Sequence, residues 1–400
     1  MRPLRVAILA DYKEEGWPSM DRVAEQLKAA LDRIPSHGAG LVATAVCPPF
    51  VRRAGRLSSG GGAVNLDRGL NRLIDYPRHA SAIAAEYDVF HVVDHSYSQL
   101  VHRLPAARTV VTCHDLDTFR SVLQPQDERR GFPFRLMTRH ILSGLGRAAV
   151  VTCDTATVRD QIVARGIVPA DRAVVAPLGV SDAFAPETDS RADREAARLV
   201  GAADGAVEIL HVGSVVPRKR IDLLLKCCGA LRRGGLEVHL VRVGGPFTAE
   251  QERLLVEEGL WGHVSVLPPV DDRVLAAVYR RAALVLVPSE REGFGLPVVE
   301  ALRCGTPVVA SDLAVLRDVG EAGVEFCAVG HVTAWKETIG RLLSERHEYP
   351  DRWAARRARG LMSATRFTWP AFAAEMAAIY ERVASGRPAP ASIDPVVRTA

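Results

Sequence analysis

The segment from Val285 to Pro307, VLVPSEREGFGLPVVEALRCGTP, sets the strongest limit on how this 400-residue chain can fold. It starts within an apolar, strand-like run, breaks at Pro288-Ser289, crosses a glycine-containing loop and becomes amphipathic at about Pro297. Proline is favoured in the first turn of a helix, and the apolar run from Pro307 to Ala310 predicts a further strand. The sequence therefore predicts a strand–loop–helix–strand unit of a parallel sheet, whose loop lies where open α/β folds bind ligands.

Two carboxylates belong to this unit, Glu292 in the loop and Glu300 within the helix. Between them, Gly293 and Gly295 allow backbone N–H groups to approach an anionic or hydroxylated ligand at a helix N-terminus. A glutamate at a helix start can also serve only to complement the helix dipole. That explanation suits Glu292 but not Glu300, whose apolar neighbours would make an unpaired charge costly. We therefore favour ligand binding for the pair.

A second loop with the same layout opens the C-terminal half of the chain. The apolar run Val207–Val212 leads into Gly213 and then, after four residues, into Arg218-Lys219-Arg220, and an amphipathic helix follows from Asp222. Glycine permits close backbone approach, the helix start supplies N–H groups, and the cations supply charge, so the loop predicts a diphosphate site. Cations at a helix start oppose the helix dipole, which argues against a purely structural role.

In the N-terminal half, polar clusters follow two strand-like runs. Val89–Val93 ends in Asp94-His95-Ser96-Tyr97, and Thr109–Thr112 is followed closely by His114-Asp115. Because the carboxyl ends of parallel strands share one edge of a sheet, both clusters are predicted to contact a ligand. A lone histidine is more often structural, but its place at a strand end favours a functional His114. The spacing of these acids and histidines does not support a metal site.

The composition is that of a globular chain with two domains. Four hundred residues exceed one ordinary core, and 48% hydrophobic with 24% charged residues are typical of a folded protein. A net charge of +4 is too small to indicate nucleic-acid binding. Seven cysteines without metal-ligand spacing predict free thiols in a reducing cytoplasm. Every apolar run is shorter than the about 18 residues that a membrane span needs.

Together, the Glu292–Glu300 pair enclosing GFG, the PRK loop and the PLGV segment at 177–180 resemble the retaining GT-B glycosyltransferases of family 4, over nearly the whole chain. The resemblance implies an α/β fold of two doubly wound, Rossmann-like domains that face one another across a cleft. The implied boundaries are 1–185 for an acceptor domain, 186–205 for a linker and 206–368 for a donor domain. A helix at 369–384 would complete the first domain, and residues 385–400 are expected to be disordered.

The resemblance also implies a bacterial, retaining hexosyltransferase of the EC 2.4 type, cytoplasmic or peripheral on the inner face of the membrane. Its donor would be a nucleoside-diphosphate sugar such as a UDP- or GDP-sugar, with no cofactor and no metal. Its acceptor could be a polysaccharide, a lipid-linked precursor or a small molecule. The implied catalytic residues are His114, Arg218, Lys219 and Glu292. The implied donor-binding residues are Gly16, Gly213, Arg218, Lys219, Leu267, Val270, Glu292, Gly293, Phe294, Gly295, Leu296 and Glu300. The implied acceptor-binding residues are Trp17, Asp94, His95, Tyr97, His114 and Asp115.

Two features depart from the family pattern. Ser214 stands where many members carry an arginine directly after the loop glycine, so one phosphate contact falls to Arg218. The first loop, which carries glycines in the family, holds Gly16 alone and continues with Trp17-Pro18.

Other functions stay open. A catalytically silent nucleotide-sugar-binding protein would be expected to lose Lys219, Glu292 or Glu300, and all three are present. An NAD-dependent oxidoreductase would carry GxGxxG between a strand and a helix, and this motif does not occur. Residues 127–147 interleave arginines with apolar side chains, which fits either a solvated helix over a core stripe or a surface that contacts anionic lipid.

Overall fold

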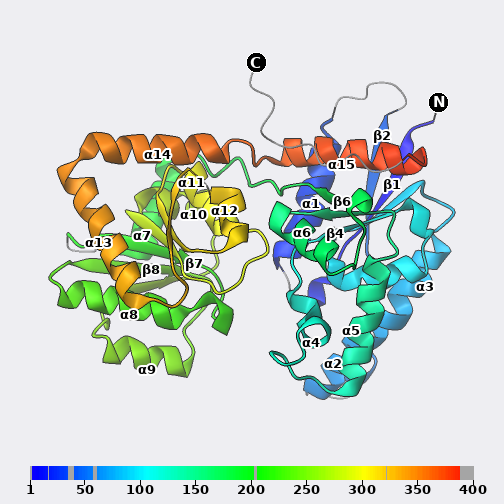
Figure 1. Cartoon of the computed structure of the whole chain (residues 1–400), viewed down its shortest axis with the longest axis horizontal. Coiled ribbons are helices and arrows are strands. Elements are labelled where there is room, and N and C mark those ends of the chain that lie inside the picture. Colours follow the sequence, from blue (N-terminus) through cyan, green and yellow to red (C-terminus); the bar gives the residue numbers. More distant parts are fainter. Residues whose placement is uncertain are drawn as a thin grey trace. The chain divides into compact units, whose positions relative to one another are not determined.

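The computed structural model describes residues 2–16, 18–34, 40–56, 61–201, 205–320 and 322–387. They divide into two compact units (Figure 1). Unit 1 comprises Met1–Gly179 with Trp369–Ala400, and unit 2 is Val180–Thr368. Each unit holds a six-stranded parallel sheet with helices between successive strands. The predicted α/β class with two doubly wound, Rossmann-like domains is therefore confirmed.

The sheet of unit 1 has the strand order β2-β1-β3-β4-β5-β6. Apart from the edge strand β2, its strands are short, largely buried and rich in β-branched residues, as strands covered on both faces must be. The strands are β1 (Leu4–Leu9), β2 (Leu41–Val46), β3 (Val89–Val92), β4 (Thr109–Cys113), β5 (Val150–Cys153) and β6 (Ala173–Val175). The helices are α1 (Pro18–Leu31), α2 (Gly61–Leu70), α3 (Tyr76–Ala82), α4 (Arg120–Leu123), α5 (Phe132–Leu145), α6 (Ala156–Ala164) and α15 (Trp369–Ala384).

Helix α15 has the bounds that the sequence predicts, and it packs on α1 beside β1 and β3 of unit 1 (Figure 1). Its buried face includes Phe372, Met376 and Tyr380. The hydroxyl of Tyr380 lies 2.7 Å from Nδ1 of His91, which is buried in β3. Helix α15, which follows unit 2 in the sequence, thus completes the hydrophobic core of unit 1.

The sheet of unit 2 has the strand order β12-β11-β10-β7-β8-β9. Its core lies between the sheet and the helices on its faces, with Leu224, Leu240, Leu286 and Trp335 among its buried members. The strands are β7 (Val207–Val212), β8 (Val238–Val243), β9 (Val264–Leu267), β10 (Leu284–Val287), β11 (Val308–Ser311) and β12 (Val324–Cys327). The helices are α7 (Ser190–Val200), α8 (Ile221–Arg233), α9 (Ala249–Glu257), α10 (Asp272–Arg281), α11 (Leu296–Arg303), α12 (Ala314–Gly320), α13 (Val332–Glu348) and α14 (Pro350–Ala364).

The segment 186–205, which the sequence predicts as a linker, instead contains α7 and belongs to unit 2. The carboxylate of Asp189 caps this helix by accepting hydrogen bonds from the backbone N–H groups of Arg191 and Ala192. Helix α7 packs on α10, and Arg280 of α10 pairs with Asp193 at 2.7 Å. The apolar stripe of α7 is made largely of alanine, which explains why the segment reads as polar.

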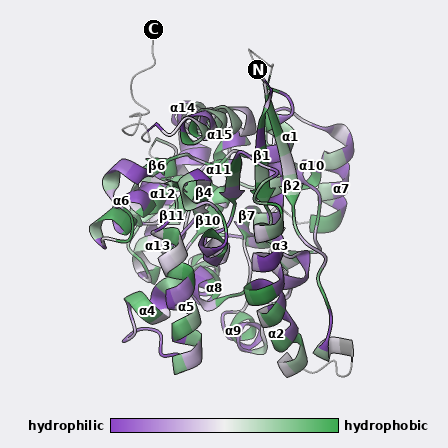
Figure 2. Cartoon of the chain, turned by 90° about the vertical axis from the view of Figure 1, so that its right-hand side faces the viewer, coloured by the Kyte–Doolittle hydropathy of each residue, from purple (hydrophilic) through white to green (hydrophobic). Residues whose placement is uncertain are grey.

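From residue 388 onward, the tail that the sequence predicts to be disordered lies outside the described residues. Within the described ranges, every helix is too short or too polar to cross a membrane. Figure 2 shows hydrophilic and hydrophobic bands alternating along helices such as α5, as expected of helices that cover a sheet.

Candidate functional site

Both sheets contain a switch point, where the connections from two neighbouring strands run to opposite sides of the sheet; open α/β folds bind ligands at such points. In unit 1 it lies between β1 and β3, and in unit 2 between β7 and β10. The loop from Gly213 to Lys219 follows β7, and the loop from Glu290 to Gly295 follows β10. The two loops that the sequence singles out in unit 2 therefore meet at its switch point.

The predicted residues Arg218, Lys219 and Glu292 form one cluster there. The Nζ of Lys219 lies 2.6 Å from Oε1 of Glu292, and Nη1 of Arg218 lies 3.4 Å from Oε2. Ser289, which the sequence argument did not include, donates its hydroxyl to the same carboxylate at 2.7 Å. Only 6% of the Glu292 side chain and 12% of the Lys219 side chain are exposed. Charges held this way need little reorganisation to act on a ligand.

The Glu292 carboxylate is ionised because of its neighbours. Burial opposes ionisation, but the charges of Lys219 and Arg218, together with hydrogen bonds from Lys219 and Ser289, hold the pKa of Glu292 below its ordinary value. Sequence reasoning assigned the two cations to a diphosphate and the carboxylate to a sugar. The structure shows that the Glu292 carboxylate also pairs with both cations and offsets one of their two charges.

The GFG loop buries its one large side chain, so it can offer a ligand only backbone groups. Gly295 adopts φ +95°, and a Cβ at this position would lie 2.6 Å from Cδ2 of Leu316, so both the conformation and the space require glycine. Phe294 is buried against Phe367, with ring centroids 5.6 Å apart. Gly293 and Leu296 are half-buried, and Leu296 begins α11. A donor-binding role of Phe294 is thereby limited to its backbone.

The second glutamate of the pair, Glu300, is buried in α11 and faces α10. Its Oε2 accepts a hydrogen bond of 2.8 Å from the hydroxyl of Tyr279. Tyr279 is not among the residues that the sequence singles out. It lies on α10, the helix directly before β10. The donor-binding role expected of Glu300 stays a prediction.

Four further donor-side predictions concern backbone positions. The N–H of Gly213 donates to the carbonyl of Val243 at 2.9 Å, so it is not available to a ligand. Leu267 is the last residue of β9, and its side chain is buried, so it can offer only its backbone. Val270 lies beyond it and is half-buried. In unit 1, Gly16 adopts φ +75° after β1, at the switch-point edge.

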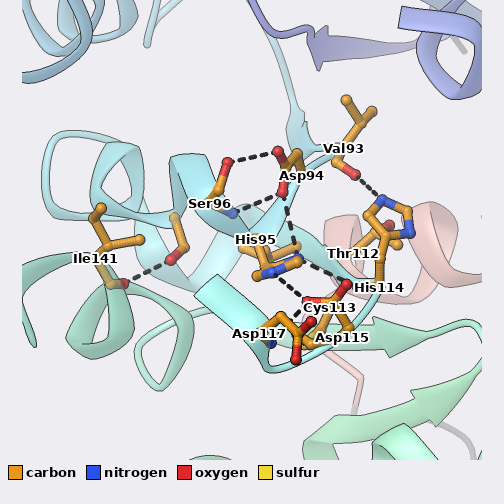
Figure 3. Close-up of polar contacts among 12 residues, drawn as sticks. Val93, Asp94, His95, Ser96, Thr112, Cys113, His114, Asp115, Asp117 and Ile141 are labelled. Atoms are coloured by element: carbon orange, nitrogen blue, oxygen red, sulfur yellow. Dashed lines mark hydrogen bonds and ion pairs between the residues drawn. The ribbon is translucent and has the colours of Figure 1, made fainter. Parts of the chain in front are cut away.

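The polar residues at the carboxyl edge of unit 1 form a connected network (Figure 3). Asp94 accepts hydrogen bonds from the backbone N–H and the hydroxyl of Ser96, at 2.8 and 2.5 Å. His95 lies between acids, with Nδ1 3.3 Å from Asp94 and Nε2 3.6 Å from Asp115. Asp115 is the most accessible of these side chains, with 30% exposed. The sequence argument correctly groups Asp94, His95 and Asp115 at one edge.

The ring of His114 is fully engaged by the protein. Its Nδ1 lies 2.7 Å from Oδ2 of Asp154. Its Nε2 lies 2.8 Å from the carbonyl oxygen of Val93 (Figure 3). Burial disfavours the charged ring, but the Asp154 carboxylate and the carbonyl outweigh burial and raise the pKa of His114 to about 9. Two acceptors require both ring nitrogens to be protonated. His114 is therefore a buried group that links Asp154 to Val93, and its expected contact with the donor and the acceptor stays a prediction.

This charged pair predicts how stability depends on pH. The pKa of His114 is about 9 in the folded chain and about 6.5 in the unfolded chain. Its contribution is complete below pH 6.5 and is lost as the pH rises toward 9, by roughly 3 kcal/mol. Urea denaturation of the wild type should show this loss, and the Asp154→Asn variant should not. The exposed Asp160→Asn variant serves as the control. An unchanged pH slope in Asp154→Asn would contradict the assignment.

The side chain of Tyr97, a predicted acceptor residue, is enclosed by the protein. Tyr97 is 1% exposed, its ring packs on Tyr12 and Tyr76, and the guanidinium of Arg72 lies 4.1 Å from its centroid. Aromatic packing thus surrounds the ring of Tyr97, and its acceptor-binding role stays a prediction. Trp17 lies outside the described residues.

Two buried acids at this edge, Asp11 and Asp154, are not among the residues that the sequence singles out. Asp11 follows β1 at the switch point, and its buried carboxyl oxygens receive no hydrogen bond from N–H or O–H groups of the described residues. Burial and the neighbouring Asp94 carboxylate raise the pKa of Asp11 well above its ordinary value. Asp154 precedes α6, whose N-cap is Thr155, accepting from the N–H of Val158. The position of Asp11 directly after a strand was the available signal.

Two family models match the chain, Glycosyltransferase Family 4 over residues 22–184 and Glycosyl transferases group 1 over residues 193–359. The D-inositol 3-phosphate glycosyltransferase 1 of Catenulispora acidiphila is 30% identical over 318 residues, 75% of this chain and 73% of that protein. The D-inositol 3-phosphate glycosyltransferase of Xylanimonas cellulosilytica is 38% identical over 230 residues, 55% of this chain and 53% of that protein. The chain thus spans about half the length of several curated relatives that it matches.

Solved structures also resemble this chain over almost its full length. Sucrose-phosphate synthase from Thermosynechococcus elongatus superposes with a TM-score of 0.74 at 22% identity, covering 96% of this chain and 99% of that one. Anabaena HepE in complex with UDP and glucose superposes with a TM-score of 0.69 at 16% identity, covering 94% and 99%. At these identities the likeness shows the fold alone.

Proposed function

Because this chain belongs to the family 4, group 1 glycosyltransferases with the GT-B fold, we propose that it transfers a sugar from a nucleoside-diphosphate sugar to an acceptor hydroxyl, retaining the anomeric configuration without a metal ion. The cluster of Arg218, Lys219 and Glu292 at the switch point of unit 2 carries this proposal. Two cations beside a buried carboxylate match a ligand that carries a diphosphate at one end and a hydroxylated sugar at the other.

On this proposal, Arg218 and Lys219 neutralise the charge that grows on the departing diphosphate. Glu292 and the backbone N–H groups from Gly293 to Gly295 hold the donor sugar. Glu300, fixed by Tyr279, accepts hydrogen bonds from the ribose. If the acceptor attacks from the face that the diphosphate leaves, retention needs no carboxylate nucleophile.

We assign the acceptor to the carboxyl edge of unit 1. The carboxylates of Asp94 and Asp115 suit an acceptor with several hydroxyl groups, since ionised carboxylates only accept hydrogen bonds. Relatives named for D-inositol 3-phosphate act on a molecule of that kind, and a polyhydroxylated acceptor is the class we propose here. On this proposal, the charged ring of His114 stabilises the edge through its contacts with Asp154 and Val93 and does not contact the acceptor.

The first test is thermal stability of the purified protein with UDP, GDP, ADP, TDP or NAD, each without added metal. One nucleoside diphosphate should stabilise the protein, by roughly 2.7 kcal/mol at 100 times its dissociation constant. The shift should disappear in the Lys219→Ala and Glu300→Ala variants. Stabilisation by NAD would favour an oxidoreductase, and stabilisation by none would overturn the transferase proposal. Binding without transfer to any polyol or sugar acceptor would identify a silent nucleotide-sugar-binding protein.

We also propose that α5 brings unit 1 to anionic membranes. The start of this helix exposes 71% of Phe132 and 55% of Leu136, with the exposed arginines Arg129, Arg130 and Arg139 nearby in the sequence. Exposed apolar side chains beside cations suit an anionic bilayer surface. The Phe132→Ser/Leu136→Ser variant should sediment less with phosphatidylglycerol vesicles than the wild type.

Leu66→Ser is the matched control for this measurement, because Leu66 is also 55% exposed but lies on α2. Wild-type protein that stays in the supernatant with phosphatidylglycerol vesicles would leave α5 as a solvated helix over its core stripe.

A further inference from the structure

Arg242, near the end of β8, is a fully buried cation whose partners are backbone carbonyls. Its Nη2 donates to the carbonyl oxygen of Gly213 at 3.0 Å, and its Nη1 donates to that of Gly245. The guanidinium also lies 5.0 Å from the ring centroid of Phe247. Among the described residues, the ion pairs give Arg242 no carboxylate, whereas Lys219 and Arg218 share Glu292.

A buried cation without a counter-charge is costly, so its retention calls for a physical reason. Burial lowers the pKa of Arg242 to about 10, which still leaves the side chain charged at neutral pH. Its neighbour His211, paired with it in register between β7 and β8, is buried and cannot offset the charge. Burial, with the charges of Arg242 and Lys219, lowers the pKa of His211 to about 3, so that ring is neutral.

The position of Arg242 links it to the donor loop. It ties the turn after β7 to the turn after β8, where the two backbones touch: a Cβ at Gly244 would lie 2.0 Å from the carbonyl oxygen of Gly213. The same loop continues to Arg218 and Lys219, the cations proposed to meet the diphosphate. Ser214, the residue after Gly213, brings no charge of its own.

We propose that Arg242 is a positioning residue for the donor diphosphate, fixing the Gly213 turn and supplying an unpaired positive charge beneath it. This inference rests on the proposed function. It explains the buried charge: the anion that offsets Arg242 is the ligand. If Arg242 only held the neighbouring carbonyl groups in place, an uncharged side chain with hydrogen-bond donors would serve equally well. Substitutions at this position can therefore separate hydrogen bonding from charge.

The experiment measures dissociation constants by calorimetry, for whichever of UDP, GDP, ADP or TDP stabilises the wild type and for the corresponding nucleoside. Arg242→Gln keeps donors for the carbonyls without charge, Arg242→Met removes both, and Arg242→Lys keeps the charge. We expect both uncharged variants to bind the diphosphate at least tenfold more weakly, while nucleoside affinity changes less than twofold. Arg242→Lys should recover diphosphate binding to within about threefold of the wild type. Arg232→Met is the control, because Arg232 bonds the carbonyl of Val238 at the opposite end of β8.

Equal losses of diphosphate and nucleoside affinity in Arg242→Gln would overturn the charge role and leave a structural clamp. If Arg242→Met fails to fold, Arg242→Gln and Arg242→Lys still separate charge from hydrogen bonding. Wild-type protein that binds none of the diphosphates would overturn the proposed function itself. If the wild type binds normally and the variants lose diphosphate and nucleoside affinity equally, only the role of Arg242 is overturned.

Discussion

The Lys219→Ala variant is expected to lose at least 100-fold in transferase kcat/KM. Lys219 is held 2.6 Å from Glu292 with little of its side chain exposed, so its charge is fixed before the donor binds. Removing one preorganised group that stabilises developing charge typically costs about 100- to 1,000-fold in rate. The loss should appear mainly in kcat, because the charge on the diphosphate grows as the bond to the sugar breaks.

Lys226→Ala is the matched control, because Lys226 lies on α8 in the same unit and takes no part in the Glu292 cluster. Its kcat/KM should stay within about twofold of the wild type. Denaturation curves must accompany the kinetics, since Lys219→Ala also leaves Glu292 with one cation fewer. A Lys219→Ala enzyme with near wild-type kcat would contradict the proposed role in leaving-group departure.

The second large effect is expected from Gly244→Ala in the turn after β8. Gly244 has φ +132°, and an added Cβ would lie 2.0 Å from the carbonyl oxygen of Gly213, a backbone atom that cannot turn aside. The turn must open, which we expect to cost about 3 kcal/mol or more of unfolding free energy. Opening it also moves the donor loop, so diphosphate affinity should fall together with stability.

Gly245→Ala provides a close comparison in the same turn. Gly245 also has a positive φ, +97°, but an added Cβ would meet no atom within 4 Å. The substitution should cost only the backbone strain, about 1–2 kcal/mol, and should leave diphosphate affinity nearly unchanged. Guanidinium denaturation and calorimetry on both variants test the pair. Similar costs for both would show that the contact with Gly213 is relieved without opening the turn.

The fold could be predicted from the sequence because each strand, loop and helix is indicated by residues close together in the chain. Short apolar runs, loops with glycine and proline, and amphipathic segments each span fewer than about 20 residues, and they placed the loops around Lys219 and Glu292 correctly. Helix α7 was not predicted because its buried face is made largely of alanine within a polar segment. The dipole argument that drew attention to Arg218 and Lys219 was also local.

The contacts that the sequence could not predict join distant residues through the order of the strands. Asp154 reaches His114 across adjacent strands β4 and β5, and Asp11 meets Asp94 across β1 and β3. Both pairs depend on register, which periodicity does not fix. The bond between Tyr279 and Glu300 was hidden for a similar reason, because it depends on how α10 packs against α11.

Because α15 belongs to unit 1, unit 2 can be completed before unit 1 during synthesis, although unit 1 begins first. Unit 2 is one continuous stretch, whereas unit 1 needs Trp369–Ala384, which leaves the ribosome only after all of unit 2. Until then, the apolar surfaces of α1 and β1 that α15 covers stay open to solvent or chaperones. The half of the protein that is made first is therefore the half that finishes folding last.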